Sequence, residues 1–155
     1  IPWQGFFADL ENNKVQIFED YGTGYSPEHS YFLYLSYMVE GRMRVSLPVK
    51  EGVKGIRIDP AETSCMVRML AARLNEEELP LSEPAYLAMN GWELSKKKEA
   101  NPVFFFHTND PNINIRLEKV EHSGNELLEV EFEIERLSEE TASVLEANLK
   151  RRRWF

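Results

Sequence analysis

The chain has 155 residues, of which 43% are hydrophobic, and these values suit one compact domain with a single buried core. Its formal net charge is −8, and the basic run 150–153 leaves −12 on the rest of the chain. An acidic body repels phosphate backbones, so we expect no nucleic-acid binding by the globular part. The basic run itself could contact RNA or anionic lipid, but it also suits the solvated last turn of a helix, and we favour the helix.

Cysteine content and hydropathy indicate the cellular compartment of the protein. Cys65 is the single cysteine, which excludes an internal disulfide, and its apolar neighbours predict a buried core residue. No apolar run approaches the roughly 20 residues of a membrane helix, and no signal peptide is recognisable. We therefore expect a cytoplasmic protein without membrane insertion. Because the chain begins at Ile1 rather than Met, we expect it to be part of a longer protein.

The sequence predicts strands and loops in the first half of the chain. Residues 14–20 alternate enough for a strand, and 20–27 form a loop rich in Gly, Ser, Asp and Pro. Residues 32–39 and 42–47 flank Glu40-Gly41, which predicts a hairpin. A short strand, 56–58, follows. The run 65–74 fits helical spacing as well as strand spacing, and we choose a strand from its context.

The second half continues the pattern and ends differently. Residues 85–89 and 92–94 flank Asn90-Gly91, which predicts a type I′ hairpin. Strands are expected at 103–106, 113–120 and 127–137; the phenylalanine run 104–106 indicates burial on both faces. The last strand alternates strictly, so its acidic face should meet water. Ser138 is a suitable N-cap for a helix in which Ala142, Leu145 and Leu149 recur at helical spacing.

Two strands close on Asp-Pro, once at Asp59-Pro60 and again at Asp110-Pro111. Asp can bond its own following backbone and Pro removes a donor, so each pair ends a strand abruptly and redirects the chain. Roughly nine or ten short strands followed by one helix predict an all-β protein, an antiparallel sandwich of jelly-roll type. We expect the sandwich in residues 1–137, and a helix or linker toward a neighbouring domain in 138–155.

Several segments together resemble a β-sandwich module found beside glycosyltransferase domains in large bacterial proteins that build cell-surface polysaccharides of the O-antigen or rhamnan type. The resemblance covers about Val15 to Leu117 and rests on residues 15–20, 22–30, 47–48, 56–60 and 108–113. It implies an accessory role, a glycan partner, neighbouring glycosyltransferase domains and a place at the inner face of the membrane through the parent protein. It transfers no catalytic residue.

Catalytic signatures are absent from the sequence. There is no Asp-x-Asp motif to hold a divalent cation against a nucleotide sugar, no phosphate-binding glycine loop, no nucleophile elbow and no zinc spacing. We therefore expect no cofactor, no metal and no catalytic residue. The oxygen-bearing residues Asp9, Glu11, Asn12 and Asn13 could hold calcium, but they lack EF-hand spacing. His29, His107 and His122 are scattered, which favours solvated or structurally bonded imidazoles.

Aromatic side chains in polar loops are candidates for sugar binding, because their faces stack on pyranose C–H groups. Tyr21 and Tyr25 in the glycine loop and Trp92 after Asn90-Gly91 are the predicted ligand-binding residues, although each could equally be a packing residue. Trp3 and Trp154 are expected to pack against neighbouring domains.

Arg57 and Asp59 lie two residues apart on one strand and so face the same side. We expect them to pair with each other or with Asp110 in a strand-end lock that stabilises the end of the sandwich. The predicted function is thus a non-catalytic accessory module that binds carbohydrate or positions catalytic domains. Two alternatives stay open: a small glycan-active hydrolase or lyase that uses groove carboxylates, and a structural spacer that dimerises through the terminal helix.

Overall fold

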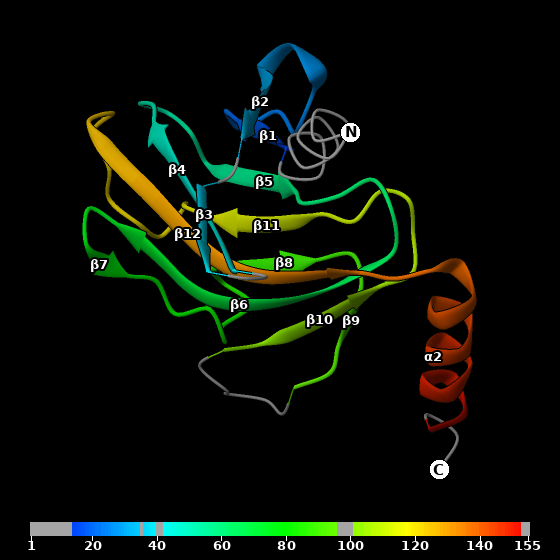
Figure 1. Ribbon diagram of the computed structural model, residues 1–155. Coiled ribbons are helices and arrows are strands. Elements are labelled where there is room, and N and C mark those ends of the chain that lie inside the picture. The colour runs from blue at the N-terminus through cyan, green and yellow to red at the C-terminus, as the bar shows by residue number, and fades with distance from the viewer. Residues whose placement is uncertain (1–13, 35, 40–41, 96–100, 153–155) are drawn as a thin grey trace.

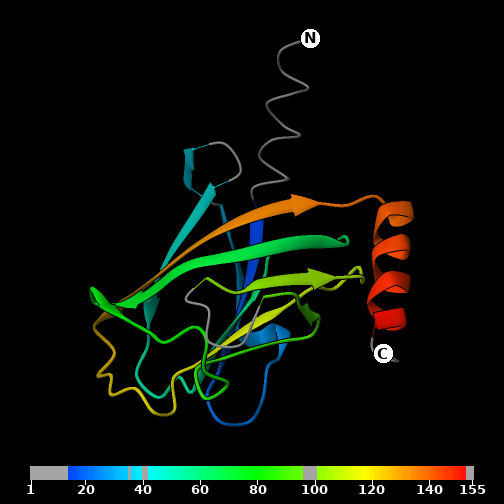
Figure 2. The ribbon, with the colours of Figure 1, turned by 90° about the horizontal axis from the view of Figure 1, so that it is seen from below.

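The computed structural model describes residues 14–34, 36–39, 42–95 and 101–152. In these residues two antiparallel sheets pack face to face, and one α-helix follows them (Figures 1 and 2). The predicted all-β sandwich with a C-terminal helix is confirmed. The residues weighed as calcium ligands and not favoured, 9–13, lie outside the described residues, as do Trp3 and Trp154.

The first sheet has five strands in the order β2-β1-β5-β11-β8. Their bounds are β1 Lys14–Asp20, β2 Ser30–Tyr34, β5 Gly55–Asp59, β8 Leu87–Met89 and β11 Ile113–Arg116. A 3-10 helix, η1 Pro27–His29, precedes β2. All neighbours pair antiparallel, and β1 is hydrogen-bonded to β2 on one side and to β5 on the other.

The second sheet has seven strands in the order β3-β4-β12-β6-β10-β9, with β7 paired to β6. Their bounds are β3 Ser36–Val39, β4 Arg42–Val49, β6 Cys65–Leu74, β7 Glu77–Glu78, β9 Trp92–Glu93, β10 Val103–Phe106 and β12 Glu126–Arg136. The long strands β12 and β6 run side by side through its middle (Figure 1).

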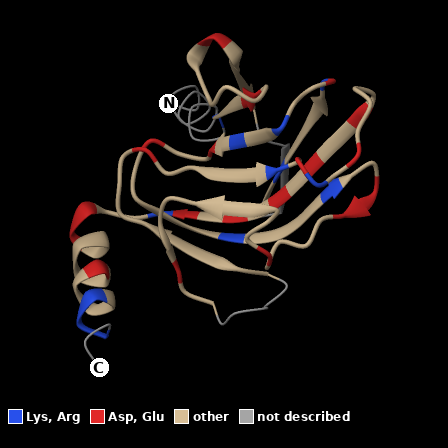
Figure 3. Cartoon of the chain, turned by 180° about the vertical axis from the view of Figure 1, so that it is seen from behind, with Lys and Arg blue, Asp and Glu red and all other residues tan. Residues whose placement is uncertain are grey.

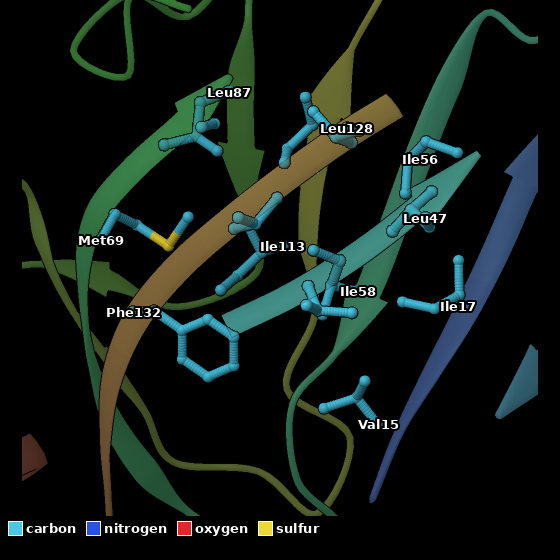
Figure 4. Close-up of a cluster of buried hydrophobic side chains, with 14 of the residues drawn as sticks. Val15, Ile17, Leu47, Ile56, Ile58, Met69, Leu87, Ile113, Leu128 and Phe132 are labelled. Atoms are coloured by element: carbon cyan, nitrogen blue, oxygen red, sulfur yellow. The ribbon is translucent and has the colours of Figure 1, made fainter. Parts of the chain in front are cut away.

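The core fills the space between the sheets. Val15 and Ile17 of β1, Ile58 of β5 and Phe132 of β12 are at most 1% exposed, and they point toward one another from the two sheets (Figure 4). In each strand these residues alternate with outward-facing ones, as the two-residue period of a strand requires. Cys65 is buried as predicted, and burial raises the pKa of its thiol to about 12.

Both Asp-Pro pairs mark places where the chain leaves one sheet for the other. Asp59 ends β5 in the five-stranded sheet, and the chain then enters β6 in the seven-stranded sheet. Asp110-Pro111 lies between β10 and β11, where the chain crosses back from the seven-stranded sheet to the five-stranded sheet. The two crossovers lie together, because the side chain of Arg57 contacts both aspartates.

Of the two predicted hairpins, one is present in part and the other is wrong. β3 pairs with β4 as predicted, but residues 32–39 do not form one strand, because β2 pairs with β1 in the other sheet. The Asn90-Gly91 hairpin is wrong, because β8 pairs with β11 and β9 pairs with β10. Gly91 is needed for close approach and not for positive φ: a Cβ there would lie 2.3 Å from the Phe105 carbonyl oxygen.

The ambiguous run 65–74 is a strand, β6, and a β-bulge explains its helix-like spacing. Met69 pairs with Phe132 and Ala71 with Glu131, so Leu70 is the extra residue of the bulge. The extra residue shifts the buried positions from 67 and 69 to 72 and 74. A strand with one bulge thus acquires a three-residue interval, which periodicity alone reads as helical.

The C-terminal helix, α2 Glu139–Arg152, stands beside the end of the sandwich at which β12 ends (Figures 1 and 2). Ser138 caps it as predicted, its Oγ accepting a hydrogen bond from the Thr141 N–H at 3.2 Å. The ring of His107, which follows β10, bonds Glu139 at 2.6 Å and also Glu146. In the described part of the chain no helix has the length and apolar character of a membrane span.

Candidate functional site

A groove of about 520 Å³ opens on the outer side of the five-stranded sheet, at the end where the two Asp-Pro crossovers meet. We call it the outer groove. The start of β1, the edge strand β2, both crossovers and the end of β12 contribute to its walls. Its lining residues are Lys14, Gln16, Phe32, Asp59, Ala61, Glu62, Thr63, Asn109, Asp110 and Arg136.

Two exposed aromatic rings lie on β2, and one of them, Phe32, lines this groove. Phe32 is 52% exposed and Tyr34 is 60% exposed, and their positions two residues apart put them on the same face of β2. Leu33 between them packs against the core instead. We call Phe32 and Tyr34 the aromatic row. The ammonium of Lys14 lies 4.8 Å from the centre of the Phe32 ring, which places a hydrogen-bond donor beside the ring.

Two lining residues of the groove, Asp59 and Asp110, belong with Arg57 to the strand-end lock. The Arg57 guanidinium donates two parallel hydrogen bonds of 2.8 Å to the two carboxylate oxygens of Asp59. It also donates to Asp110 at 3.5 Å, so one side chain joins the two crossovers. The pairing expected from the sequence spacing is present; its effect on stability stays a prediction.

The environment of the lock holds Arg57 in place. Its guanidinium lies 4.6 Å from the centre of the Phe18 ring, on the outer face of the sheet. The hydrogen bonds to Asp59 raise the pKa of Arg57, which stays charged. Burial raises the pKa of the Asp59 carboxyl, although the hydrogen bonds from Arg57 act against that shift. The lock is thus a bidentate ion pair in a partly desolvated position.

Asn90 fixes the second crossover from the far side. Its amide donates to the Asp110 carbonyl at 2.9 Å, and its Oδ1 accepts from the Asn112 N–H at 2.8 Å. The Thr108 hydroxyl accepts from the Asp110 N–H at 3.1 Å. These bonds satisfy the backbone of a tight loop and hold one wall of the outer groove rigid.

The three aromatic residues predicted to bind ligand lie in separate places. Tyr21 packs against the core and tilts against His29, with ring centres 5.0 Å apart. Tyr25 is half-buried with its hydroxyl over Gly55, and burial raises its pKa to about 12. Trp92 lies on β9 in the other sheet, opposite Phe105. The loop that holds the two tyrosines is organised by Asp20, which accepts hydrogen bonds from the N–H groups of Gly22 and Gly24.

The sequence did not point to the aromatic row or to Lys14 as site residues. Residues 31–34 are all aromatic or aliphatic, so their alternation shows no contrast between a buried and an exposed face. Only the pairing of β2 at the sheet edge decides that Phe32 and Tyr34 face outward. An exposed aromatic residue at a sheet edge is also the less common case, because such residues are usually core.

Metal ligation has no support in the described part of the chain, where no group of three His, Cys, Asp or Glu side chains could hold a metal ion. Of the histidines, His29 packs at a tilt against Tyr21, His107 bonds the helix and His122 bonds the Val120 carbonyl. Comparison of the chain with protein-family models, with curated proteins and with solved structures found no match.

Proposed function

We propose that this domain is a glycan-binding module and that the outer groove is its binding site. The single observation that carries the proposal is the aromatic row: Phe32 lines a groove that also contains amides, carboxylates and a lysine, and Tyr34 extends the exposed aromatic surface along β2. Sugar recognition needs both parts: flat apolar faces for the C–H groups of a pyranose and polar groups for its hydroxyls.

The rigidity of the site supports the same reading. The lock and Asn90 fix the walls before any ligand arrives, so little conformational entropy is lost on binding. Gln16, which pairs with Phe32 across β1 and β2, adds an amide that can donate and accept next to the ring. A neutral polymer with many hydroxyls suits such a mixed lining better than a highly charged ligand does.

We further propose, from the resemblance to modules of polysaccharide synthesis, that the domain serves a bacterial glycosyltransferase as an accessory part. In that role the groove holds the growing or finished polymer near catalytic domains elsewhere in the parent protein. The domain itself then needs no catalytic machinery.

The proposal is tested by titrating the domain with fragments of bacterial surface polysaccharides while recording amide chemical shifts. Shifts should centre on β1, β2 and the two crossovers. Phe32→Ala and Tyr34→Ala should each weaken binding at least tenfold, which is about 1.4 kcal/mol. Val144→Ala and Leu127→Ala are matched controls, because both remove exposed apolar side chains away from the groove. Binding that is indifferent to the aromatic row would refute the assignment.

A second candidate is a glycan-active hydrolase, favoured by one observation. Asp59 and Asp110 share the Arg57 guanidinium at the groove, and the pKa of Asp59 is raised, as for a general acid in glycoside hydrolysis. Against it, Arg57 occupies both oxygens of Asp59. Incubation with a panel of glycans and nucleotide sugars decides: we expect no turnover. Turnover that survives repurification and disappears in Asp59→Asn would establish the enzyme instead.

A further inference from the structure

A second cavity, of about 500 Å³, lies at the edge of the sandwich between the end of β1, η1 and the end of β4. We call it the edge pocket. Its lining includes Glu19, Tyr21, Glu28, His29, Tyr31 and Lys50. It shares no lining residue with the outer groove, so the two sites can be tested separately.

Glu19 is the unusual residue of this pocket. It occupies an inward-facing position of β1, two residues after Ile17, and is only 2% exposed. Its Oε1 accepts from the Lys50 ammonium at 3.2 Å. Its Oε2 is buried and has no hydrogen-bond partner among the described residues. Buried carboxylate oxygens almost always accept a hydrogen bond in folded proteins, so Oε2 can accept one from a ligand.

Tyr31 presents a second unsatisfied group to the same pocket. Its hydroxyl is buried without a partner in the described part of the chain. Burial, followed by the nearby Glu19 carboxylate, raises the pKa of Tyr31 to about 12, so the phenol keeps its proton at neutral pH. The pocket therefore offers one acceptor, on Glu19, and one group able to donate or accept, on Tyr31.

The remaining walls supply flat apolar surface. The Tyr21 and His29 rings lie 5.0 Å apart at an interplanar angle of 58°. Tyr31 adds a third ring, with the Lys50 ammonium 5.8 Å from its centre. Lys50, Glu28 and His29 are exposed and form the rim of the pocket.

Charge selects the class of ligand. A cationic ligand would meet the Lys50 ammonium, which already pairs with Glu19. An anionic ligand would meet the carboxylates of Glu19 and Glu28. A neutral ligand with neighbouring hydroxyls avoids both conflicts, because one hydroxyl can donate to a carboxylate while the next accepts from a phenol.

We propose that the edge pocket binds a single neutral sugar residue, with one sugar hydroxyl donating to Glu19 Oε2, the next accepting from the Tyr31 hydroxyl, and the ring lying against Tyr21. The site goes beyond the proposed groove function, since it takes one sugar unit at the sandwich edge and not a polymer along the outer face.

The test is a titration of the domain with methyl α-glucopyranoside and methyl α-mannopyranoside, followed by amide chemical shifts. A shallow site of this kind should bind with a Kd of about 1 mM, and shifts should centre on Glu19, Tyr31 and Lys50. Tyr31→Phe removes only the unpaired hydroxyl and keeps the ring, so the fold should persist while affinity falls at least tenfold. Glu19→Gln should weaken binding similarly.

Tyr86→Phe is the matched control, because it removes the hydroxyl of a tyrosine that lines neither the outer groove nor the edge pocket. Tetramethylammonium and inorganic phosphate are the charged probes and should cause no shifts at Glu19. If neither glycoside binds, or if Tyr31→Phe binds as well as the parent, the proposal is overturned and the two buried atoms are simply hydrated. Loss of binding in Phe32→Ala but not in Tyr31→Phe would assign the sugar to the outer groove alone.

Discussion

The outer faces of the two sheets are built from the same alternation but differ in what they offer to a partner. On the five-stranded sheet, the outward positions hold Phe18 beneath Arg57 and the exposed aromatic row beside the outer groove. On the seven-stranded sheet, the outward positions of β12 are glutamates flanked by arginines of β4 and β6. Figure 3 shows these acidic residues repeated along β12.

The lock on the five-stranded sheet and an exposed ion pair on the seven-stranded sheet differ in burial, although Arg73 and Glu131 on that second sheet are also recessed, at 31% and 12% exposed. Arg68 and Glu133 on the seven-stranded sheet are 53% and 42% exposed and lie 3.6 Å apart. Arg57 and Asp59 on the five-stranded sheet are 21% and 11% exposed and join in a bidentate pair. A solvent-exposed ion pair contributes little to the free energy of unfolding. Removing one partner of a recessed pair costs much more, because the other charge is left partly buried without a counter-charge. The outward glutamates of β12 therefore lie on a hydrated face, whereas the recessed lock holds two lining residues of the outer groove in place.

The largest expected effect comes from Arg57→Ala, which leaves Asp59 partly buried without its partner. We expect a loss of about 3 kcal/mol in the free energy of unfolding, measured by urea denaturation. Arg68→Ala is the matched control on the other face and should cost less than about 1 kcal/mol. Equal costs for the two variants would remove the distinction between the faces. Unchanged stability with lost sugar binding would make Arg57 a ligand residue.

Asn90→Ala should have the next largest effect. It removes the two bonds to the second crossover, to the Asp110 carbonyl and from the Asn112 N–H, and should cost about 1 kcal/mol for each bond. Glycan affinity should fall as well, because the wall formed by Asn109 and Asp110 loses its support. Asn125→Ala, in an exposed turn, serves as the control. A variant with full stability and full affinity would show that this wall does not depend on Asn90.

Salt should separate the two faces further. At about 1 M ionic strength the Debye length falls to about 3 Å, so exposed pairs are screened while the recessed lock is screened much less. The cost of Arg68→Ala should then approach zero, and the cost of Arg57→Ala should largely remain. Denaturation of both variants at low and high sodium chloride measures this. A parallel decline would mean that water reaches the lock freely.

The smallest expected effect is a pH dependence where α2 meets the seven-stranded sheet. Hydrogen bonds that the His107 ring donates to Glu139 and Glu146 raise the pKa of His107 above 6.5, so its contribution to stability is full below pH 6.5 and is lost as pH rises through the raised pKa. Both glutamates have pKa values lowered below 4.5, so their contribution is present above pH 4.5 and is lost as pH falls through the lowered values. The protection of α2 amides, relative to their intrinsic exchange rates at each pH, should therefore be greatest between pH 4.5 and pH 6.5.

His107→Asn should flatten that profile, and His122→Asn, which alters a histidine bonded to the Val120 carbonyl, should not. A profile that keeps its shape in His107→Asn would assign the pH dependence to other groups.

Much of the fold could be predicted from local patterns. Strict alternation in residues 130–135, the phenylalanine run and Ser138 before an apolar stripe predicted β12, a strand buried on both faces and the start of α2. Phe104, Phe105 and Phe106 are at most 3% exposed, as expected. These features depend on neighbours in sequence, which is why the sequence alone determines them. The spacing of Arg57 and Asp59 likewise put both side chains on one face of a strand.

Pairing between distant segments was decided only by the tertiary structure. Asn90-Gly91 has the composition of a tight turn, yet its flanking strands pair with β11 in one sheet and β10 in the other. The aromatic row faces outward because β2 lies at a sheet edge, and Glu19 is buried because β4 brings Lys50 beside it. Each of these outcomes depends on which strand lies opposite, and that depends on how the whole core closes.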